Sequence, residues 1–229
     1  MADEVSQDRA ALTGSNARHL AQVLRVKIGQ DFEIAGEGRV RLGTVSSVAG
    51  DRVEFTLGDE IESKQTVPIT LVVAISKFDR FEWAIEKATE LGVTRIMPVV
   101  ARRTEAHLAQ SAAKRVERWR RIAHEVSQQS RRVSPPEIAD PMKLKDALGL
   151  EAALKILCAE TEEGAMLCDA FNSKPASVAL AIGPEGGWTE EEVQAFQKAG
   201  WKPVSLGATI LRVETAVVAA CAITGAMLE

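Results

Sequence analysis

Two glycine-containing stretches near the C-terminus have the composition of ligand-binding loops. Glycine lets bare backbone N–H and C=O groups approach a ligand without a side chain between them. The stretches are Ile182-Gly183-Pro184-Glu185-Gly186-Gly187-Trp188-Thr189 and Leu206-Gly207-Ala208-Thr209-Ile210-Leu211-Arg212-Val213-Glu214-Thr215-Ala216. We interpret both as candidate binding loops.

The elements around these loops are those of an open α/β sheet. The apolar run 177–182 before the first loop is typical of a strand buried on both faces. Thr189 and Glu192 then have the spacing of a capping box, which predicts a helix directly after the loop. The second loop repeats the arrangement, with a strand at 203–206, a turn at Gly207 and a helix from about Glu214. Because such sheets bind ligands beyond the carboxyl ends of their strands, the two loops could form the walls of one pocket.

Other catalytic patterns fit poorly. The sequence has no phosphate-binding G-x-x-x-x-G-K-[ST] loop, and the 36–38 glycine pair has Arg41 where a dinucleotide fingerprint needs its third glycine. His19, His107 and His124 are isolated, so we predict no metal site. The three cysteines lack metal-ligand spacing, and we expect reduced thiols, with Cys158 and Cys221 in apolar runs.

A helix expected at Ala112–Ser130 carries one apolar and one basic face. The apolar stripe consists of Ala112, Val116, Trp119, Ala123 and Val126. The basic positions are Lys114, Arg118 and Arg121, followed by Arg131 and Arg132; Arg18, His19 and Arg25 form a second cluster near the N-terminus. Such a face either binds RNA phosphates or is a solvated surface, and Arg102-Arg103 has the same two interpretations. Because the formal net charge is −4, RNA binding would depend on local patches.

The order of patterns predicts two domains, residues 1–65 and 66–229. Short alternating segments around Phe32/Ile34, Val40/Leu42 and Val53/Phe55/Leu57, with turns at 36–38 and 49–51, indicate a small antiparallel barrel or sheet. The polar stretch Gly58–Gln65 marks the expected boundary. Strands and helices then alternate, which predicts a mainly parallel sheet with helices on both faces. The expected elements are strands at 69–75, 94–100 and 154–159 and a helix at 79–91, in addition to those above.

The sequence predicts a protein that stays in the cytoplasm. No apolar run reaches the roughly 18 residues of a membrane span. The first residues also lack the basic-then-apolar order of a signal peptide.

Four motifs together resemble one known family. The two loops look like the signature motifs of the RsmE family of 16S ribosomal RNA uridine N3-methyltransferases, in the knotted SPOUT superfamily. The likeness extends to Lys77-Phe78-Asp79-Arg80 with Lys87-Ala88-Thr89-Glu90-Leu91-Gly92-Val93, and to Arg18-His19-Leu20 with Val23-Leu24-Arg25. It therefore covers nearly the whole chain.

The resemblance implies an S-adenosyl-L-methionine-dependent rRNA methyltransferase. Proteins of this kind bind the cofactor in a deep trefoil knot, act as homodimers on small-subunit ribosomal RNA, and have an N-terminal barrel-like (PUA-like) domain that helps to hold RNA. By position, the implied cofactor-binding residues are Ile182, Gly183, Pro184, Glu185, Gly186, Gly187, Leu206, Gly207, Ile210, Leu211, Arg212 and Thr215. The implied RNA-binding residues are Arg18, His19, Arg25, Lys114, Arg118, Arg121, Arg131 and Arg132.

The chain departs from the family pattern at two places. Arg18-His19 stands where members often have paired histidines, and Arg131 replaces the glycine of the family's E-Q-S-G-R segment. Both departures fall in regions where the resemblance implies RNA contact.

The implied chemistry needs a base and an anion-stabilising group. The N3 proton of uridine must leave before or during attack on the methyl carbon, and an arginine near the base oxygens would stabilise the anion. The candidates are Arg212 for that role and Glu185 for the proton. Alternatively, Arg212 pairs with Glu214 or another acid, and Glu185 only holds backbone amides of the loop. Two other functions stay open: a non-catalytic RNA-binding adaptor that retains the fold, and a nucleotide-using small-molecule enzyme.

Overall fold

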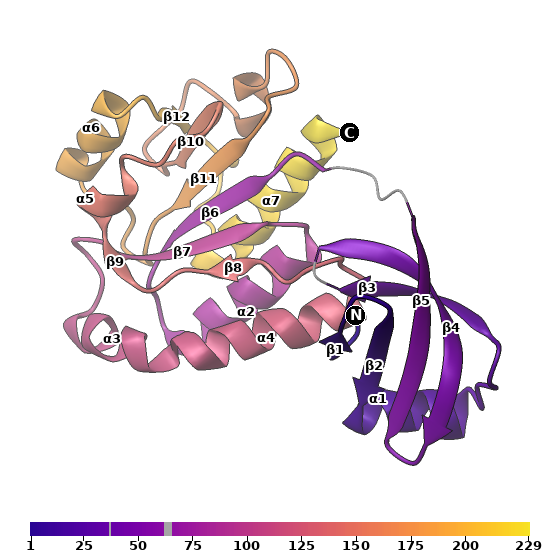
Figure 1. Cartoon of the computed structure of the whole chain (residues 1–229). Coiled ribbons are helices and arrows are strands. Elements are labelled where there is room, and N and C mark those ends of the chain that lie inside the picture. Colours follow the sequence, from indigo (N-terminus) through magenta and orange to yellow (C-terminus); the bar gives the residue numbers. More distant parts are fainter. Residues whose placement is uncertain (37, 62–65) are drawn as a thin grey trace. The chain divides into compact units, whose positions relative to one another are not determined.

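The computed structural model describes residues 1–36, 38–61 and 66–229. The chain folds into two compact units (Figure 1). The first contains Met1–Gln65 together with Ser127–Ser134, and the second contains Thr66–Val126 and Pro135–Glu229. Each unit has a hydrophobic core of its own.

The first unit is built on an antiparallel sheet in the order β1-β2-β5-β4-β3. The strands are Glu4–Val5 (β1), Arg9–Thr13 (β2), Asp31–Gly36 (β3), Arg39–Ala49 (β4) and Arg52–Ile61 (β5). The register between β4 and β5 shifts twice, and such bulges increase the twist of a strand pair. The resulting curled sheet confirms the predicted small barrel-like domain.

The core of this unit explains why the alternating segments become strands. Val45, Val53 and Phe55 point inward and are almost fully buried, and the Phe55 ring meets the Phe32 ring edge-on with centroids 6.0 Å apart. Gly50 has φ +57° in the turn between β4 and β5, as the 49–51 turn signal predicts. The expected turn at 36–38 includes Glu37, which lies outside the described residues. The short strands β1 and β2 have no periodic signal in the sequence, and neither is predicted by it.

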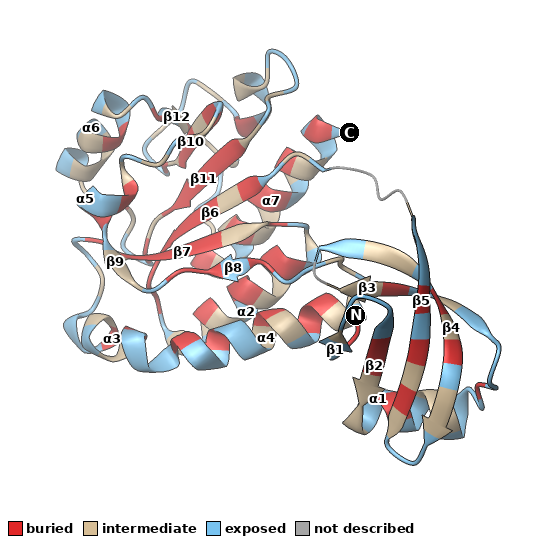
Figure 2. Ribbon diagram, in the orientation of Figure 1, coloured by how far each residue is buried: buried red, intermediate tan, exposed pale blue. Residues whose placement is uncertain are grey.

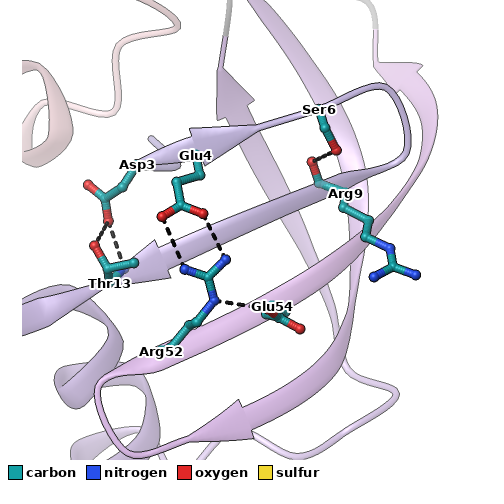
Figure 3. Close-up of polar contacts among 7 residues, drawn as sticks. All are labelled: Asp3, Glu4, Ser6, Arg9, Thr13, Arg52 and Glu54. Atoms are coloured by element: carbon teal, nitrogen blue, oxygen red, sulfur yellow. Dashed lines mark hydrogen bonds and ion pairs between the residues drawn. The ribbon is translucent and has the colours of Figure 1, made fainter.

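Arginine–carboxylate contacts hold the N-terminal strands in place (Figure 3). The Arg52 guanidinium donates to Glu4 at 2.7 and 3.1 Å and to Glu54 at 2.9 Å, so it links β1 to β5. Asp3 accepts the backbone N–H of Thr13 at 2.8 Å. Hydrogen bonding to Arg52 lowers the pKa of Glu4, and the two carboxylates raise the pKa of Arg52.

Helical turns follow β2. Helix α1 spans Gly14–Arg18 and continues as the π-helical turn η1, His19–Val23. At the other end of the sheet, β5 continues to Ile61, beyond the strand end expected at Leu57. Part of the expected boundary stretch, residues 62–65, lies outside the described residues.

The second unit contains a parallel sheet in the order β12-β10-β11-β6-β7-β8, with β9 also paired to β7. Within the described residues, its strand pairs are all parallel. The strands are Ile69–Ala74 (β6), Arg95–Val100 (β7), Glu137–Ile138 (β8), Met142–Lys143 (β9), Leu154–Cys158 (β10), Val178–Ile182 (β11) and Lys202–Val204 (β12). All five residues of β11 are buried, as expected of a central strand with both faces covered (Figure 2).

Helices cover both faces of this sheet, which confirms the predicted α/β fold class. The α helices are Phe78–Glu90 (α2), Ala106–Ser111 (α3), Val116–Gln129 (α4), Leu144–Ala147 (α5), Glu190–Lys198 (α6) and Val213–Leu228 (α7). Two 3-10 turns are Ala112–Arg115 (η2) and Leu167–Ala170 (η3). The deep trefoil knot stays a prediction from the resemblance.

Strand alternation assigns the helices to their faces. In β6, Leu71 and Val73 pack into a core with residues of α2, α4 and α7. Val72 and Ala74 point into the opposite core, which contains residues of α5 and α6. The apolar stripe predicted for the basic helix is buried, with Trp119 fully buried against Phe81 of α2 at a ring distance of 4.7 Å. The α-helix expected from Ala112 begins at Val116, because residues Ala112–Arg115 form the 3-10 turn η2.

Candidate functional site

A cavity of about 130 Å³ lies beyond the carboxyl ends of β10, β11 and β12. The first loop, the end of β10 with the two residues after it, and the second loop with the start of α7 form its walls. The lining residues are Cys158, Ala159, Glu160, Ile182, Gly183, Pro184, Gly187, Trp188, Ser205, Leu206, Gly207, Ala208, Thr209, Ile210, Leu211, Val213 and Ala216. The structure thus places both predicted loops around one cavity.

Most of the predicted cofactor-binding residues line this cavity. They are Ile182, Gly183, Pro184, Gly187, Leu206, Gly207, Ile210 and Leu211. The other four belong to the same loops but are not among the lining residues: Glu185, Gly186, Arg212 and Thr215.

The glycines of the first loop have different structural roles. Gly187 has φ +69°, and a Cβ there would overlap the Glu160 carboxylate. A Cβ on Gly183 would lie 3.2 Å from Nε1 of Trp188, so this glycine makes room for the indole. Gly186 faces only the flexible Arg103 side chain, at 3.2 Å. Gly187 is therefore the position with the strictest requirement for glycine.

The loop after β7 holds the first loop from outside. The Arg103 guanidinium donates to the carbonyl oxygens of Gly186 and Trp188, the latter at 3.4 Å. The Arg102 backbone N–H donates to Glu192 at 2.7 Å, and the Glu192 carboxylate also closes the predicted capping box with Thr189. Arg103, for which the sequence leaves RNA binding and plain exposure open, is an anchor of the loop.

Arg80 of α2 lies between acidic residues of both loops. Its guanidinium is 3.8 Å from Glu185 of the first loop and 3.9 Å from Glu214 of the second. Glu185 also accepts the Lys77 backbone N–H at 3.3 Å. Glu214 is largely buried, and its Oε2 has no hydrogen-bond partner among the described residues. Arg80 is the electrostatic link between the two loops.

The two predicted catalytic residues have different surroundings. Arg212 is exposed at the N-cap of α7 and has no ion pair among the described residues, so the alternative pairing with Glu214 is not found. Glu185 is engaged with Lys77 and Arg80, which matches the alternative in which it holds loop backbone.

The predicted RNA-binding residues of the second unit differ in whether their charges are paired within the protein. Arg118 forms a two-pronged ion pair with Glu82 of α2 at 2.7 and 2.8 Å, and this pairing raises the pKa of Arg118. Lys114 and Arg121 are exposed and make no ion pair within the described chain. Arg121 also lines a broad surface hollow with His124 and Glu137.

The remaining predicted RNA-binding residues belong to the first unit. Arg18 at the end of α1, His19 at the start of η1 and Arg25 after η1 are exposed, and Arg25 has φ +51°. Arg131 has φ +55°, the left-handed conformation that glycine adopts easily, so it retains the backbone conformation suited to the family's glycine. Arg132 is partly buried, which lowers its pKa, and it donates to the Ser134 carbonyl at 3.2 Å.

Several residues of the site are not predicted by the sequence. Glu160 and Cys158 line the cavity because they follow or end β10, and the rule that ligands bind at carboxyl strand ends could have found them. Trp188 and Arg80 lie inside recognised motifs that give them no role. Arg103 could be assigned only from the fold, because its contacts lie 83 and 85 residues away in sequence.

Neither a metal site nor a membrane-spanning helix is found among the described residues. No three His, Cys, Asp or Glu residues there are grouped so that they could bind a metal ion. No helix in that part of the chain has both the length and the apolar character to cross a membrane.

Comparison with known proteins gives a consistent picture. Residues 63–225 match the RNA methyltransferase domain family, and residues 12–60 match the RNA methyltransferase PUA domain family. The ribosomal RNA small subunit methyltransferase E of Synechocystis is 32% identical over 99% of this chain and 76% of its own length. The Bacillus subtilis protein of the same name is 30% identical over 90% of this chain and 85% of its own.

Solved structures agree with the sequence relatives. The ribosomal RNA small subunit methyltransferase E from Neisseria gonorrhoeae, bound to S-adenosyl methionine, superposes with a TM-score of 0.80 at 30% identity, covering 99% of this chain and 95% of that one. A putative methyltransferase from Legionella pneumophila in complex with the same cofactor gives a TM-score of 0.79 at 27% identity, with coverage of 99% and 95%. The chain belongs to the ribosomal RNA small subunit methyltransferase E family.

Proposed function

We propose that this protein transfers a methyl group from S-adenosylmethionine to N3 of a specific uridine in the 16S ribosomal RNA of the small subunit. The observation that carries the proposal is the cavity formed jointly by the two motif loops. The Neisseria relative, whose fold this chain shares over nearly its whole length, holds S-adenosyl methionine. The joint cavity in this chain and the cofactor-bound relative together support the proposal.

The residues around the cavity fit that cofactor chemically. Ile182, Leu206 and Leu211 supply apolar surface for a flat base, and glycine backbone at 183, 187 and 207 supplies N–H and C=O groups at close range. Four predicted cofactor-binding residues do not line the cavity and would shape the loops or face the second substrate. They are Glu185, Gly186, Arg212 and Thr215. When bound, the cofactor supplies an electrophilic methyl carbon.

Arg212 is the proposed anion-stabilising residue. Loss of the N3 proton leaves negative charge on the uridine base oxygens, and a guanidinium beside them stabilises that charge in the transition state. The exposure of Arg212, without an ion pair in the described chain, leaves its five donors available. Glu185 stays the candidate proton acceptor, although its contacts with Lys77 and Arg80 equally support a loop-holding role.

RNA binding is proposed for the basic residues of both units. Lys114, Arg121 and Arg18 are exposed cations that can neutralise phosphates. A substrate in the small ribosomal subunit implies that the protein acts in the cytoplasm.

A homodimer is part of the same proposal. Ile210 in the second loop is 82% exposed, and Met227 on α7 is 39% exposed. Apolar surface beside a binding loop suits a self-complementary C2 interface. Light scattering at micromolar concentration should give the mass of a dimer; a strictly monomeric mass would refute the assembly.

Calorimetry with S-adenosylmethionine and the isolated chain tests the cofactor site without RNA. Binding by the wild type is expected, and Gly187→Ala should weaken it more than tenfold, because the new Cβ strains the backbone and displaces Glu160. Gly149→Ala is the matched control, since no atom lies within 4 Å of its new Cβ and its φ is not positive. Absence of wild-type binding would instead favour the non-catalytic RNA-binding adaptor.

A further inference from the structure

Glu160 has a special position in the cavity wall. It is the second residue after β10, its side chain is exposed, and it lines the cavity. Among the lining residues of the described chain, it alone carries a formal charge. Any electrostatic preference of the cavity lining for a ligand therefore depends on this carboxylate.

The carboxylate of Glu160 is available to a ligand. Within the described residues it makes no hydrogen bond and no ion pair. Its oxygens lie against Gly187, where any side chain would overlap them. The absence of a side chain at Gly187 thus keeps the carboxylate beside the first loop.

The other polar side chains of the wall, which are those of Cys158, Trp188, Ser205 and Thr209, carry no charge that could replace it. The Ser205 hydroxyl already donates to the Gly207 carbonyl and accepts the Gly207 N–H, both at 3.2 Å. Burial raises the pKa of the Cys158 thiol to about 12, so the thiol is uncharged at neutral pH. The Trp188 side chain offers only an N–H donor, and this atom is buried without a partner in the described structure.

We propose that Glu160 binds the positively charged methionyl part of the cofactor and so determines the preference of the site for a cationic ligand. The inference rests on the proposed function, because it assumes that this cavity is the cofactor site. S-adenosylmethionine carries a sulfonium, an ammonium and a carboxylate group in that part, with a net charge of +1, and the Glu160 carboxylate is a counter-charge for either cation. The adenine and ribose parts are uncharged, so they could meet the carboxylate only through hydrogen bonds and not as counter-charges.

Three ligands separate this role from alternatives. S-adenosylmethionine has both cations, S-adenosylhomocysteine has only the ammonium, and 5′-methylthioadenosine has neither but keeps the base and ribose. Calorimetry on wild type and Glu160→Gln is expected to show an affinity loss of about 5- to 10-fold for S-adenosylmethionine and less than about twofold for 5′-methylthioadenosine. The S-adenosylhomocysteine result tells which cation is bound.

Matched variants control for folding and for net charge. Glu163→Gln removes a neighbouring carboxylate that does not line the cavity, and it should leave all three affinities unchanged. Glu160→Asp keeps the charge on a shorter side chain and should recover part of the loss. Thermal unfolding of each variant checks that the fold is intact.

Two outcomes would overturn the inference while leaving the proposed function in place. Equal losses for all three ligands would make Glu160 a ribose contact, and unchanged affinities would make it a solvated wall residue. If the wild type bound none of the ligands, the proposed function itself would fail, and the inference with it.

Discussion

At the scale of single residues, burial separates the three cysteines. Cys168 is exposed, whereas burial raises the pKa of Cys158 and of Cys221 from an ordinary 9.0 to about 12. A disulfide reagent at about pH 8 should therefore modify Cys168 rapidly, Cys158 slowly because its thiol stays protonated, and Cys221 only after unfolding. Rapid modification of more than one thiol in the folded protein would contradict this assignment.

The same shift predicts a dependence of stability on pH. A thiol whose pKa is raised in the folded state holds its proton more tightly there than in the unfolded chain. This tighter proton binding adds to the free energy of unfolding. The added stability is fully present below about pH 9 and is lost as pH rises toward 12. Replacing both buried cysteines with alanine should flatten the fall in unfolding free energy over this range.

Arg131 shows what residue types alone could and could not reveal. The resemblance implies a glycine at its position, but the positive φ of Arg131 is not visible in the sequence. A non-glycine residue in this region costs roughly 1–2 kcal/mol, so the surrounding structure must enforce it. Gly186 shows the same limit from the opposite side. It looks equivalent to Gly187 in sequence, but it has no positive φ and does not line the cavity.

At the scale of elements, helix α2 connects the two motif loops through Arg80. Arg80→Ala should weaken S-adenosylmethionine binding about 5-fold, in line with about 1 kcal/mol for ion pairs at 3.8 and 3.9 Å between partly exposed groups. It should also lower Tm, since Glu214 would stay largely buried without its partner.

Matched variants make this prediction specific. Lys87→Ala removes another cation of α2 whose partners, Glu86 and Glu90, lie on the helix itself, and cofactor affinity should be unchanged. Arg80→Lys should retain part of the binding. An Arg80→Ala protein with wild-type affinity would show that the loops are not coupled through this residue.

The basic face of α4 should not contribute evenly to RNA binding. Arg121→Ala should weaken RNA binding and reduce its salt slope by roughly one unit for each phosphate that the protein no longer neutralises. Arg118→Ala should have a smaller effect, because Glu82 already neutralises its charge. Filter binding at several salt concentrations measures the salt slope of each variant. Equal losses of RNA affinity and slope in Arg121→Ala and Arg118→Ala would contradict this prediction.

Much of the element layout follows from periodicity. The run at 177–182 could be assigned to a central strand because such a strand needs apolar residues on both faces, and Thr189 with Glu192 marks the start of the following helix. The strands β1, β8 and β9 have two residues each, which is too few for any period to show, and the five residues of β2 show no regular alternation. Interactions such as that of Arg103 with Gly186 depend on strand order, which no local pattern encodes.

At the scale of the whole molecule, both units take part in the proposed function. The second contains the cavity, both motif loops and the exposed cations Lys114 and Arg121, and the first, whose residues 12–60 match a PUA domain family, carries the exposed cations Arg18 and Arg25. Cofactor binding and RNA binding should therefore respond to different substitutions. The 1–65 and 66–229 domain division stays a prediction, and the structure adds Ser127–Ser134 to the first compact unit.

The central claim is methyl transfer to N3 of one uridine, and mapping the transferred methyl group tests it most directly. The protein is incubated with methyl-labelled S-adenosylmethionine and small ribosomal subunits from cells that lack this gene, and the labelled nucleotide is then identified. We predict label at N3 of a single uridine of the 16S ribosomal RNA, and strongly reduced turnover with Arg212→Ala on bound substrate. No incorporation, or label on another base or another atom, would contradict the account.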